Sequence, residues 1–237
     1  MVSKISVILP SYNERENIRD LVMAIENLIK NPLEIIVVDD NSPDGTWKVV
    51  EELSEKDPCV KLIRRMKERG VATAIANGTS ASTGDIVIWM DTDFSHPPKL
   101  LPKMIRAVDG YDIVIASRFV KGGKMIYTFT RNSSSRLLNL FASLMLDSSI
   151  KDYTGGYMAI KRNVLKKIKA TPLGSGHGEF AIAFIYMAKK SGFRIKEFPF
   201  TYMPRKKGQT KTSPSLWKLM KFGYTYLASI LRLRLKG

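Results

Sequence analysis

Four short runs of mostly apolar, often β-branched residues recur in the first half of the chain, and they restrict its possible folds more than any other feature. The runs are Ile5–Leu9, Ile35–Val38, Ile86–Met90 and Ile113–Ala116. Strands that are buried on both faces, as in a largely parallel sheet, have continuous apolar composition, whereas strands with one solvated face alternate. The runs therefore predict the strands of one buried sheet.

Amphipathic helical patterns lie between these predicted strands. Apolar residues recur at three- and four-residue spacing over Ile18–Ile29, just before an Asn-Pro pair, and two further helices are predicted over Thr46–Lys56 and Val71–Ala81. The alternation of strand and helix predicts an α/β domain with helices on both faces of the sheet, covering roughly residues 1–120.

The second half of the chain extends this domain. The predicted elements are a polar stretch over Thr128–Ser135, an apolar helix over Leu137–Leu146, a turn and strand over Asp152–Lys161, a helix over Phe180–Lys190, a strand over Phe193–Met203, and a last helix that starts near Ser213 and Pro214. Proline is favoured at a first helical position. We therefore expect one domain over residues 1–211, followed by a basic amphipathic helix over residues 212–237.

The charge balance favours an anionic partner. Lys and Arg number 38 and Asp and Glu number 22, so the formal net charge is +16. Nucleic acid, an anionic membrane surface and a phosphorylated substrate are all consistent with that charge. Cys59 is the only cysteine, which excludes an intrachain disulfide and a cysteine-based metal site. This cysteine usage is typical of a reducing compartment, so we expect a cytoplasmic protein.

The C-terminal region is expected to touch a membrane without crossing it. The run Ile5–Leu9 is too short for a signal-peptide core, and Leu216–Leu235 is interrupted by four basic residues. Residues 198–237 contain nine basic and no acidic residues, which is typical of an interfacial helix bound peripherally to an anionic, cytoplasmic membrane face. Leu137–Leu146 is a candidate second apolar surface. In the alternative, both helices pack on the core and their Lys and Arg side chains reach outward to solvent.

Polar and charged residues follow the predicted strands, at the edge where open α/β sheets bind ligands. These segments are Pro10–Glu14, Asp39–Ser42, Asp91–Asp93 and Ser117–Arg118. They bring several carboxylates and one arginine to a single edge. In the alternative interpretation, the Asp, Asn and Ser residues are ordinary turn and helix-cap residues.

Asp91 and Asp93 are the strongest candidates for a metal site, because a buried strand delivers both to its tip, with Ser95 and His96 close behind. Hard oxygen ligands suit Mg²⁺ or Mn²⁺, which also bind substrate phosphates. The pair therefore predicts a divalent metal on a diphosphate. The chain has two histidines, which argues against a multi-histidine zinc site, and it has no G-x-x-x-x-G-K-[ST] phosphate loop.

Eight motifs in sequence order resemble those of the family-two glycosyltransferases of GT-A fold, most closely the dolichol-phosphate mannose synthases. They are VILPSYNERENI, VVDDNSPDGT, residues 70–74, MDTDFSHPP, SRFVKGG, RNSSSRLLN, DYTGGYMAIKR and PRKKGQTK, and they span almost the whole chain. The resemblance implies an α/β GT-A fold: a Rossmann-like, mostly parallel sheet flanked by helices, with C-terminal amphipathic helices.

The resemblance also implies roles for individual residues. The catalytic residues would be Asp91, Asp93 and Arg118. The nucleotide-sugar donor would be held by Pro10, Tyr12, Glu14, Asp39, Asp40 and Asp91. The metal, Mg²⁺ or Mn²⁺, would be held by Asp91, Asp93 and Ser95. The acceptor phosphate would be met by Arg118, Arg131, Ser135, Arg205 and Lys211.

The activity implied by the resemblance is transfer of mannose from GDP-mannose to dolichyl or polyprenyl phosphate, with inversion at the anomeric carbon. A phosphate monoester is largely dianionic at pH 7, so it can attack without a general base. Ala181 and Ala183 stand where relatives commonly carry polar or acidic residues. A sugar hydroxyl would usually need a base, so the alanines favour the phosphate acceptor, although Glu179 is placed to compensate.

Other functions remain open at this point. Glucosyl or N-acetylhexosamine transfer from a UDP-sugar to the same lipid, and transfer to a saccharide, differ only in substrate. A non-catalytic sugar-nucleotide binder is disfavoured because both metal aspartates are intact. A nucleic-acid-binding protein would fit the net charge of +16, but no nucleic-acid motif accompanies it and the carboxylates at the strand ends would repel a phosphate backbone. We therefore expect no nucleic-acid partner.

Overall fold

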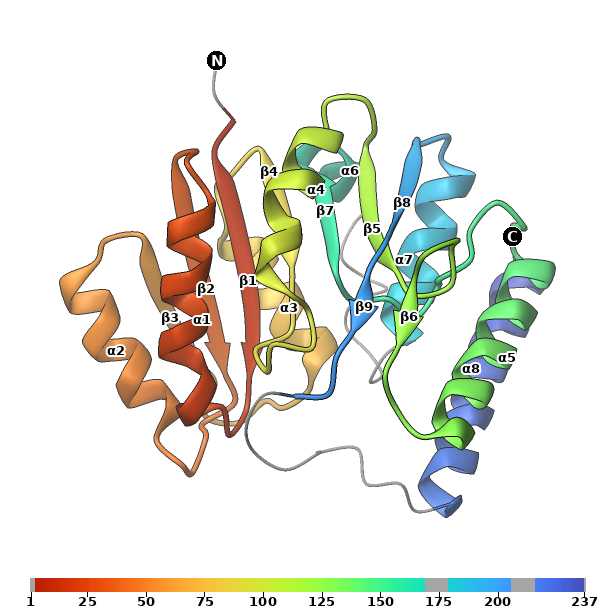
Figure 1. Ribbon diagram of the computed structural model, residues 1–237, viewed down its shortest axis with the longest axis horizontal. Coiled ribbons are helices and arrows are strands. Elements are labelled where there is room, and N and C mark those ends of the chain that lie inside the picture. Colours follow the sequence, from red (N-terminus) through yellow and green to blue (C-terminus); the bar gives the residue numbers. More distant parts are fainter. Residues whose placement is uncertain (1–2, 169–178, 206–215, 237) are drawn as a thin grey trace.

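The predicted strands form and lie in one sheet (Figure 1). The computed structural model describes residues 3–168, 179–205 and 216–236, without the side chains of residues 216–222 and 236. Its seven-stranded sheet has the order β3-β2-β1-β4-β7-β5-β8. The strands are β1 (Ile5–Ser11), β2 (Leu33–Asp39), β3 (Val60–Arg64), β4 (Ile86–Trp89), β5 (Ile113–Ser117), β7 (Met158–Lys161) and β8 (Ile195–Pro199). All described pairs are parallel except those of β7, which is antiparallel to β4 and β5.

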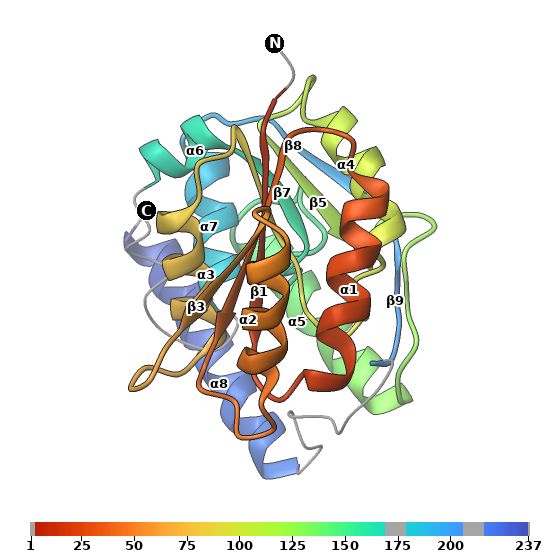
Figure 2. The same ribbon diagram turned by 90° about the vertical axis from the view of Figure 1, so that its left-hand side faces the viewer.

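Helices cover both faces of the sheet (Figure 2). The apolar side chains of α1 (Arg15–Leu28), α2 (Thr46–Lys56) and α4 (Leu101–Ala107) pack on one face. Those of α3 (Val71–Ala81), α6 (Arg162–Lys167) and α7 (Glu179–Lys190) pack on the other, with α5 (Phe129–Met145) and α8 (Leu216–Lys236) as the outermost helices there. A 3₁₀ turn, Pro98–Leu100, precedes α4. This is the helix-sheet-helix arrangement that the sequence predicts.

The register of the sheet explains why its central strands are mostly apolar on both faces. Val7 pairs with Ile35 of β2, and Ile8 pairs with Trp89 of β4. Val7 belongs to the core on the α1 side and Ile8 to the core on the α3 side, and both are fully buried. Successive side chains point to opposite faces of a strand, so each face contributes to a separate apolar core. The same register aligns Ser11 with Asp39, which places the ends of β1 and β2 side by side.

Several sequence predictions need correction in their boundaries. The polar stretch over Thr128–Ser135 is not separate from the next helix, because α5 begins at Phe129. The strand predicted over Phe193–Met203 is split into β8 and β9 (Thr201–Tyr202), and β9 pairs with β6 (Lys124–Met125) in a second sheet. Strands β3 and β6 and helices α4 and α6 were not predicted. The predicted helix start near residue 213 and the domain boundary at residue 211 lie outside the described residues.

Helix α3 approaches the sheet very closely at Gly78. A Cβ atom added there would lie 2.4 Å from a methyl group of Ile8 and 3.0 Å from one of Val38, and both side chains are buried. Gly223 of α8 is also helical, but an added Cβ would meet nothing within 4 Å. The two glycines therefore separate the packing effect of a methyl group from its effect on helix propensity.

We predict that Gly78→Ala lowers the free energy of unfolding, measured by urea denaturation, by about 1–2 kcal/mol, because overpacking a core outweighs the gain in helix propensity. The matched variant Gly223→Ala is expected to raise it by up to about 1 kcal/mol. A stabilised Gly78→Ala protein would contradict the close packing of α3 on β1.

Candidate active site

The strands β2, β1 and β4 end side by side, and the chain turns sharply after each of them. Asn13, Asn41 and Phe94 have φ values of 53°, 52° and 63°, and they are the non-glycine residues in the described part of the chain with positive φ. Asparagine visits this left-handed region readily, whereas for phenylalanine it costs on the order of 1–3 kcal/mol. Backbone strain of this kind clusters at functional sites, which singles out this edge of the sheet.

The loop after β2 is organised around Asp39, whose side chain is fully buried. The Ser42 amide donates to Oδ1 of Asp39 at 2.8 Å, and the Ser42 hydroxyl donates to Oδ2 at 2.5 Å. Burial raises the pKa of Asp39 above its ordinary value, although these hydrogen bonds oppose it. The Asn13 amide donates to Ser42 Oγ at 3.0 Å, so the loops after β1 and β2 form one unit.

Asp40, the next residue, is engaged by a partner that the sequence analysis did not identify. Its Oδ1 accepts from Arg65 Nε at 2.7 Å and also from Arg65 Nη2, and its Oδ2 accepts from the Gly70 amide at 2.8 Å. The side chains of Arg65 and Asp40 are only 4% and 10% exposed. Asp40 therefore fixes the loop that leads into α3, on the side of the predicted donor site.

Arg205 joins the loop after β1 to the loop after β4. Its Nη2 lies 2.9 Å from Glu14 Oε1 and 2.9 Å from Asp93 Oδ2. Burial alone would raise the pKa of Asp93, but hydrogen bonds from Ser95 and Arg205 outweigh it and hold this pKa below its ordinary value. Asp93 is therefore ionised at neutral pH. Arg205 follows Glu14 by 191 positions in the sequence, and the fold brings both side chains together with that of Asp93.

Asp91 is positioned by His96. The Asp91 amide donates to His96 Nδ1 at 3.0 Å, and His96 Nε2 lies 3.6 Å from Asp91 Oδ2. Burial lowers the pKa of His96, so the ring is neutral at pH 7. Its proton is on Nε2, because Nδ1 accepts a hydrogen bond. The ring stacks on Tyr157 at a centroid distance of 4.8 Å, which holds it in place against the carboxylate.

The residues at the tip of β4 fit a hard divalent cation. The Asp91 side chain is 42% exposed, and the Ser95 hydroxyl donates to Asp93 Oδ1 at 2.5 Å. All three side chains offer oxygen, which Mg²⁺ and Mn²⁺ prefer. Within the described residues, no three or more His, Cys, Asp or Glu side chains form a cluster able to hold a metal. A cation here would need further oxygen ligands from outside this carboxylate pair.

Arg118, at the end of β5, is held by Asp152. Asp152 Oδ2 accepts from the Arg118 amide and from Nε, both at 2.9 Å, and Oδ1 accepts from Nη2 at 2.7 Å. Asp152 is fully buried and the Arg118 side chain is 10% exposed. Burial alone would lower the pKa of Arg118, but the Asp152 carboxylate raises it above its ordinary value. The guanidinium is therefore a fixed positive charge beside the sheet edge.

Four of the remaining predicted residues, Pro10, Tyr12, Arg131 and Ser135, lie in the described part of the chain. The Pro10 carbonyl accepts a hydrogen bond from Thr92 at 3.2 Å, and the guanidinium of Arg69 lies 5.4 Å from the Tyr12 ring. Arg131 and Ser135 lie on α5, with the Arg131 guanidinium 4.0 Å from the Tyr127 ring. The predicted acceptor residue Lys211 lies outside the described residues.

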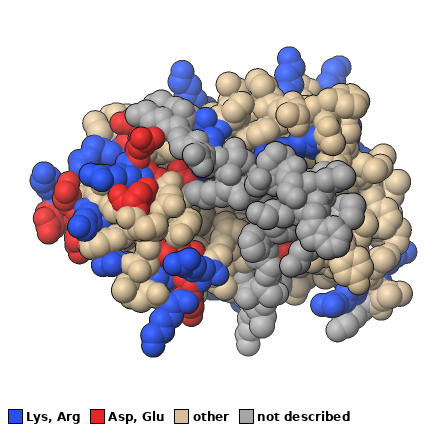
Figure 3. Space-filling view, turned by 90° about the horizontal axis from the view of Figure 1, so that it is seen from below, with Lys and Arg blue, Asp and Glu red and all other residues tan. Residues whose placement is uncertain are grey.

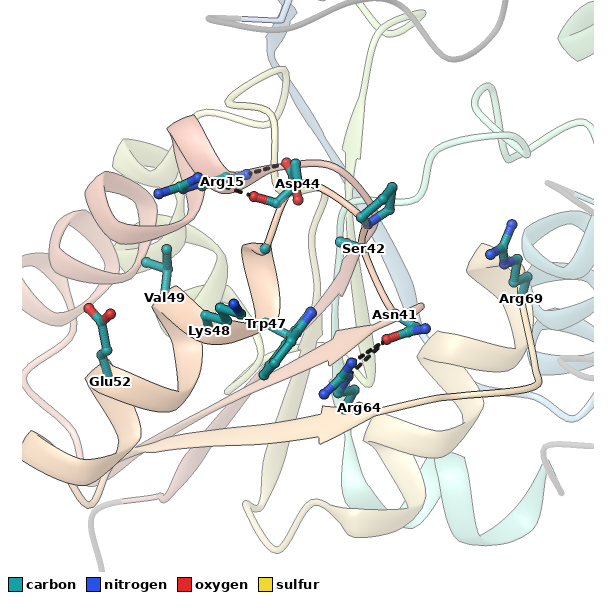
Figure 4. A pocket seen from close by; sticks show the side chains of 12 residues that line it. Arg15, Asn41, Ser42, Asp44, Trp47, Lys48, Val49, Glu52, Arg64 and Arg69 are labelled. Atoms are coloured by element: carbon teal, nitrogen blue, oxygen red, sulfur yellow. Dashed lines mark hydrogen bonds between the residues drawn. The ribbon is translucent and has the colours of Figure 1, made fainter.

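A cavity of about 650 Å³ adjoins the loop after β2 (Figure 4). Its floor is formed by Trp47, with the guanidinium of Arg64 3.4 Å from the ring centroid and held by two hydrogen bonds to Asn41 Oδ1. Arg15 and Asp44 form its upper rim. None of the residues predicted to bind the donor lines this cavity. It is therefore a neighbour of the carboxylate centre and not part of it.

Charged residues are unevenly distributed over the surface at the ends of the strands. Viewed from that side, Lys, Arg, Asp and Glu gather on the left, at the end of the molecule that carries α1 and α2, while the described surface on the right shows mainly scattered Lys and Arg among other residues (Figure 3). At the right-hand end α5 packs against α8 (Figure 1). Exposed apolar residues follow helical spacing on both: Leu137, Leu140 and Leu144 on α5, and Tyr224, Leu227, Leu231 and Leu235 on α8. Each of the two helices thus exposes apolar side chains along one of its faces.

No helix in the described part of the chain combines the length and the apolar character needed to cross a bilayer.

Comparison with known proteins identifies related sequences and folds. The model of the family described as "Glycosyl transferase family 2" matches residues 6–169. A dolichol-phosphate mannosyltransferase of Pyrococcus furiosus is 40% identical over 88% of this chain and 59% of its own length. A polyprenol monophosphomannose synthase of Mycolicibacterium smegmatis is 35% identical over 88% of this chain and 81% of its own length. This chain thus spans less than two thirds of the Pyrococcus protein.

Among solved structures, a glucosyl-3-phosphoglycerate synthase of Mycobacterium tuberculosis in complex with Mn²⁺, UDP-glucose and phosphoglyceric acid superposes with a TM-score of 0.71. The superposition covers 98% of this chain and 80% of the synthase chain, at 18% sequence identity. At that identity the similarity concerns the fold, and it agrees with the GT-A architecture expected from the sequence motifs.

We predict that Asp152→Ala lowers the free energy of unfolding by about 3–5 kcal/mol, because it leaves the buried guanidinium of Arg118 without its counter-ion. Urea denaturation measures this loss. The double variant Arg118→Met with Asp152→Ala removes both charges and is expected to recover part of it. If Asp152→Ala is as stable as the wild type, Arg118 and Asp152 do not form the buried ion pair described above.

Proposed function

Because this chain belongs to glycosyl transferase family 2, we propose that it transfers mannose from GDP-mannose to dolichyl or polyprenyl phosphate. One juxtaposition carries the proposal: Arg205 contacts Asp93 of the carboxylate pair, and Arg118 is linked through Thr154 to α5, whose outer side is apolar. This arrangement combines a place for a metal-bound diphosphate with a surface for a lipid. The names of the Pyrococcus and Mycolicibacterium relatives support the choice of mannose and a polyprenyl acceptor.

On the donor side, we propose that Asp91, Asp93 and Ser95 hold Mg²⁺ or Mn²⁺ with the diphosphate of the donor. The metal would neutralise charge on the departing GDP. Pro10, Tyr12, Glu14, Asp39 and Asp40 would hold the nucleoside. Asp39 and Asp40 are fixed by Ser42 and Arg65, so the wall that they form is rigid before the donor arrives.

On the acceptor side, Arg118, Arg131, Ser135, Arg205 and Lys211 would bind the lipid phosphate and the donor phosphates. Arginine suits this task because its planar guanidinium binds phosphate through two parallel hydrogen bonds. The largely dianionic acceptor phosphate would attack the anomeric carbon opposite the leaving diphosphate, which inverts the configuration. Ala181 is buried and Ala183 half-buried in α7, and neither supplies a base that a sugar hydroxyl would need.

We further propose that the apolar face of α5 and α8 rests on an anionic membrane surface, at the cytoplasmic side, with residues 212–237 as the interfacial segment. An apolar face flanked by Arg131, Arg136, Arg232 and Arg234 supports this orientation, because such helices gain from both apolar burial and attraction to anionic lipids. The lipid phosphate would then enter the site from the side of α5.

The test of the proposed activity is transfer of radiolabelled mannose from GDP-mannose to a short polyprenyl phosphate in detergent, with Mg²⁺ or Mn²⁺ and with EDTA as control. Labelled lipid that depends on the metal is the expected result. Label transferred only from a UDP-sugar would replace the proposal by glucosyl or N-acetylhexosamine transfer. Label transferred only to a saccharide would overturn the lipid acceptor, and no transfer from any donor would favour a non-catalytic binder.

We predict that Asp93→Ala reduces kcat in this assay by at least about a hundredfold, because groups that stabilise transition-state charge contribute at this scale. The matched control is Asp109→Ala, an exposed aspartate between α4 and β5 at the opposite edge of the sheet, which should leave kcat within about twofold. Asp93→Ala with normal kcat would remove Asp93 from the site.

We predict that the full chain co-sediments with anionic phospholipid vesicles at low salt, and that the double variant Leu140→Glu with Leu144→Glu binds them at least about tenfold more weakly, because charge on the apolar face opposes burial in the interface. Both leucines are exposed, so the fold should persist. Met23→Glu, on α1 and also exposed, is the control that should bind normally. Equal vesicle binding by all three proteins would contradict this orientation.

A further inference from the structure

The Arg118 guanidinium donates hydrogen bonds to both carboxylate oxygens of Asp152 and to one hydroxyl group, and that hydroxyl group connects it to α5. Arg118 Nη2 donates to Thr154 Oγ1 at 2.7 Å, in addition to its bonds with Asp152. The same Thr154 oxygen accepts a hydrogen bond from Asn139 Nδ2 at 2.8 Å. One hydroxyl group therefore connects the guanidinium at the end of β5 to a side chain in the middle of α5.

Every hydrogen-bonding position of the Asn139 side chain has a partner. Its Nδ2 also donates to the Ser135 carbonyl at 2.9 Å, and its Oδ1 accepts from the amides of Tyr153 at 2.8 Å and Thr154 at 3.2 Å. A side-chain amide has two donors and one acceptor oxygen with two lone pairs, so all four capacities are filled. Asn139 is 1% exposed, although asparagine is a poor helix former. Its place inside α5 is therefore explained by this network.

The network joins the two sides of the proposed acceptor site. Arg118 lies on one side, and α5 carries Arg131 and Ser135 on the other. Two aromatic rings also connect the two sides. The Arg131 guanidinium lies 4.0 Å from the centroid of the Tyr127 ring, and the Arg118 guanidinium lies 5.7 Å from that of the Tyr202 ring. The centroids of the two rings are 5.7 Å apart. The separation between the two sides is thus set by residues other than those expected to meet phosphate.

We propose that Thr154, held by Asn139, is a positioning residue that sets the distance and orientation of Arg118 relative to α5 for the lipid phosphate. This inference rests on the proposed function, because it concerns the acceptor side of the same site. Without the Thr154 hydroxyl, Arg118 keeps its bonds to Asp152 but loses its side-chain hydrogen bond toward Asn139 of α5. The guanidinium is then still charged and buried, but is no longer held against the helix that meets the lipid.

The test compares Thr154→Val, which removes the hydroxyl at nearly constant volume, with Thr154→Ser, which retains it. Thr154→Val is expected to raise KM for farnesyl phosphate about tenfold, because an Arg118 side chain that is no longer fixed must be ordered when the phosphate binds, with a smaller effect on KM for GDP-mannose. Thr154→Ser should restore the wild-type KM. Equal KM values for wild type and Thr154→Val, or failure of Thr154→Ser to restore KM, would overturn the proposal.

A second variant and a binding measurement keep the inference separate from folding and from the proposed activity. Thr154→Ala removes the same hydroxyl with a smaller side chain and leaves the Tyr153 and Thr154 amides bonded to Asn139, so it should reproduce the effect on KM. Farnesyl phosphate binding by calorimetry, with farnesol as control, needs no turnover. If the wild type transfers no mannose, the proposed activity fails, but about tenfold weaker binding to Thr154→Val still supports positioning. Equal binding by the two proteins, or none by the wild type, contradicts it.

Discussion

Carboxylates that are withdrawn from water at one edge of the sheet are the constraint around which this molecule is organised. Burying a charge is costly unless it is paired and hydrogen-bonded. Four buried acidic groups at this edge have an arginine partner: Asp40 has Arg65, Asp152 has Arg118, and Asp93 and Glu14 share Arg205. Asp39 has hydrogen bonds from Ser42 instead. The arginines come from other parts of the chain than their carboxylate partners, so the site is formed only in the folded protein.

The same pairing explains how the site can serve a highly charged substrate. Arg118 and Arg205 are positioned before any phosphate arrives, and positioned charges stabilise a developing negative charge without reorganising during the reaction. Asp91 differs from the other acids, since its side chain is 42% exposed and is oriented by the neutral ring of His96. An accessible carboxylate beside enclosed ones suits a group that must exchange water for a metal. The apolar face of α5 and α8 lies on the side where a lipid acceptor would approach.

Most strands and helices of the domain could be predicted from the sequence, because their patterns lie within short segments of the chain. Continuous apolar runs marked the strands β1, β2, β4 and β5, and three-to-four spacing marked α1, α2 and α3. Strand β3 was missed because Val60–Arg64 is short and contains two basic residues, as is common in an edge strand. The split of β8 from β9 also left no local signal, since it depends on which neighbour each strand pairs with.

The candidate site was predicted only as far as the strand ends. Position after a strand identified Asp39, Asp91 and Asp93, and family motifs supplied Arg131 and Ser135. Nothing in the spacing joined Arg118 to Asp152, 34 residues away, because that contact depends on β7 entering the sheet antiparallel between β4 and β5. Arg65 lay in a basic stretch without a distinguishing pattern. The polar Asn139 within a mostly apolar helical segment was a signal that was available and was not interpreted.

The most direct test of the central claim, that this sheet edge is a metal-dependent nucleotide-sugar site, is calorimetric titration of the full chain with GDP in the presence of Mn²⁺ and again in EDTA. The account predicts one GDP bound per chain with Mn²⁺ and at least about tenfold weaker binding in EDTA, because the metal joins the carboxylates to the diphosphate. Equal affinity under both conditions, or no binding with Mn²⁺, would contradict it.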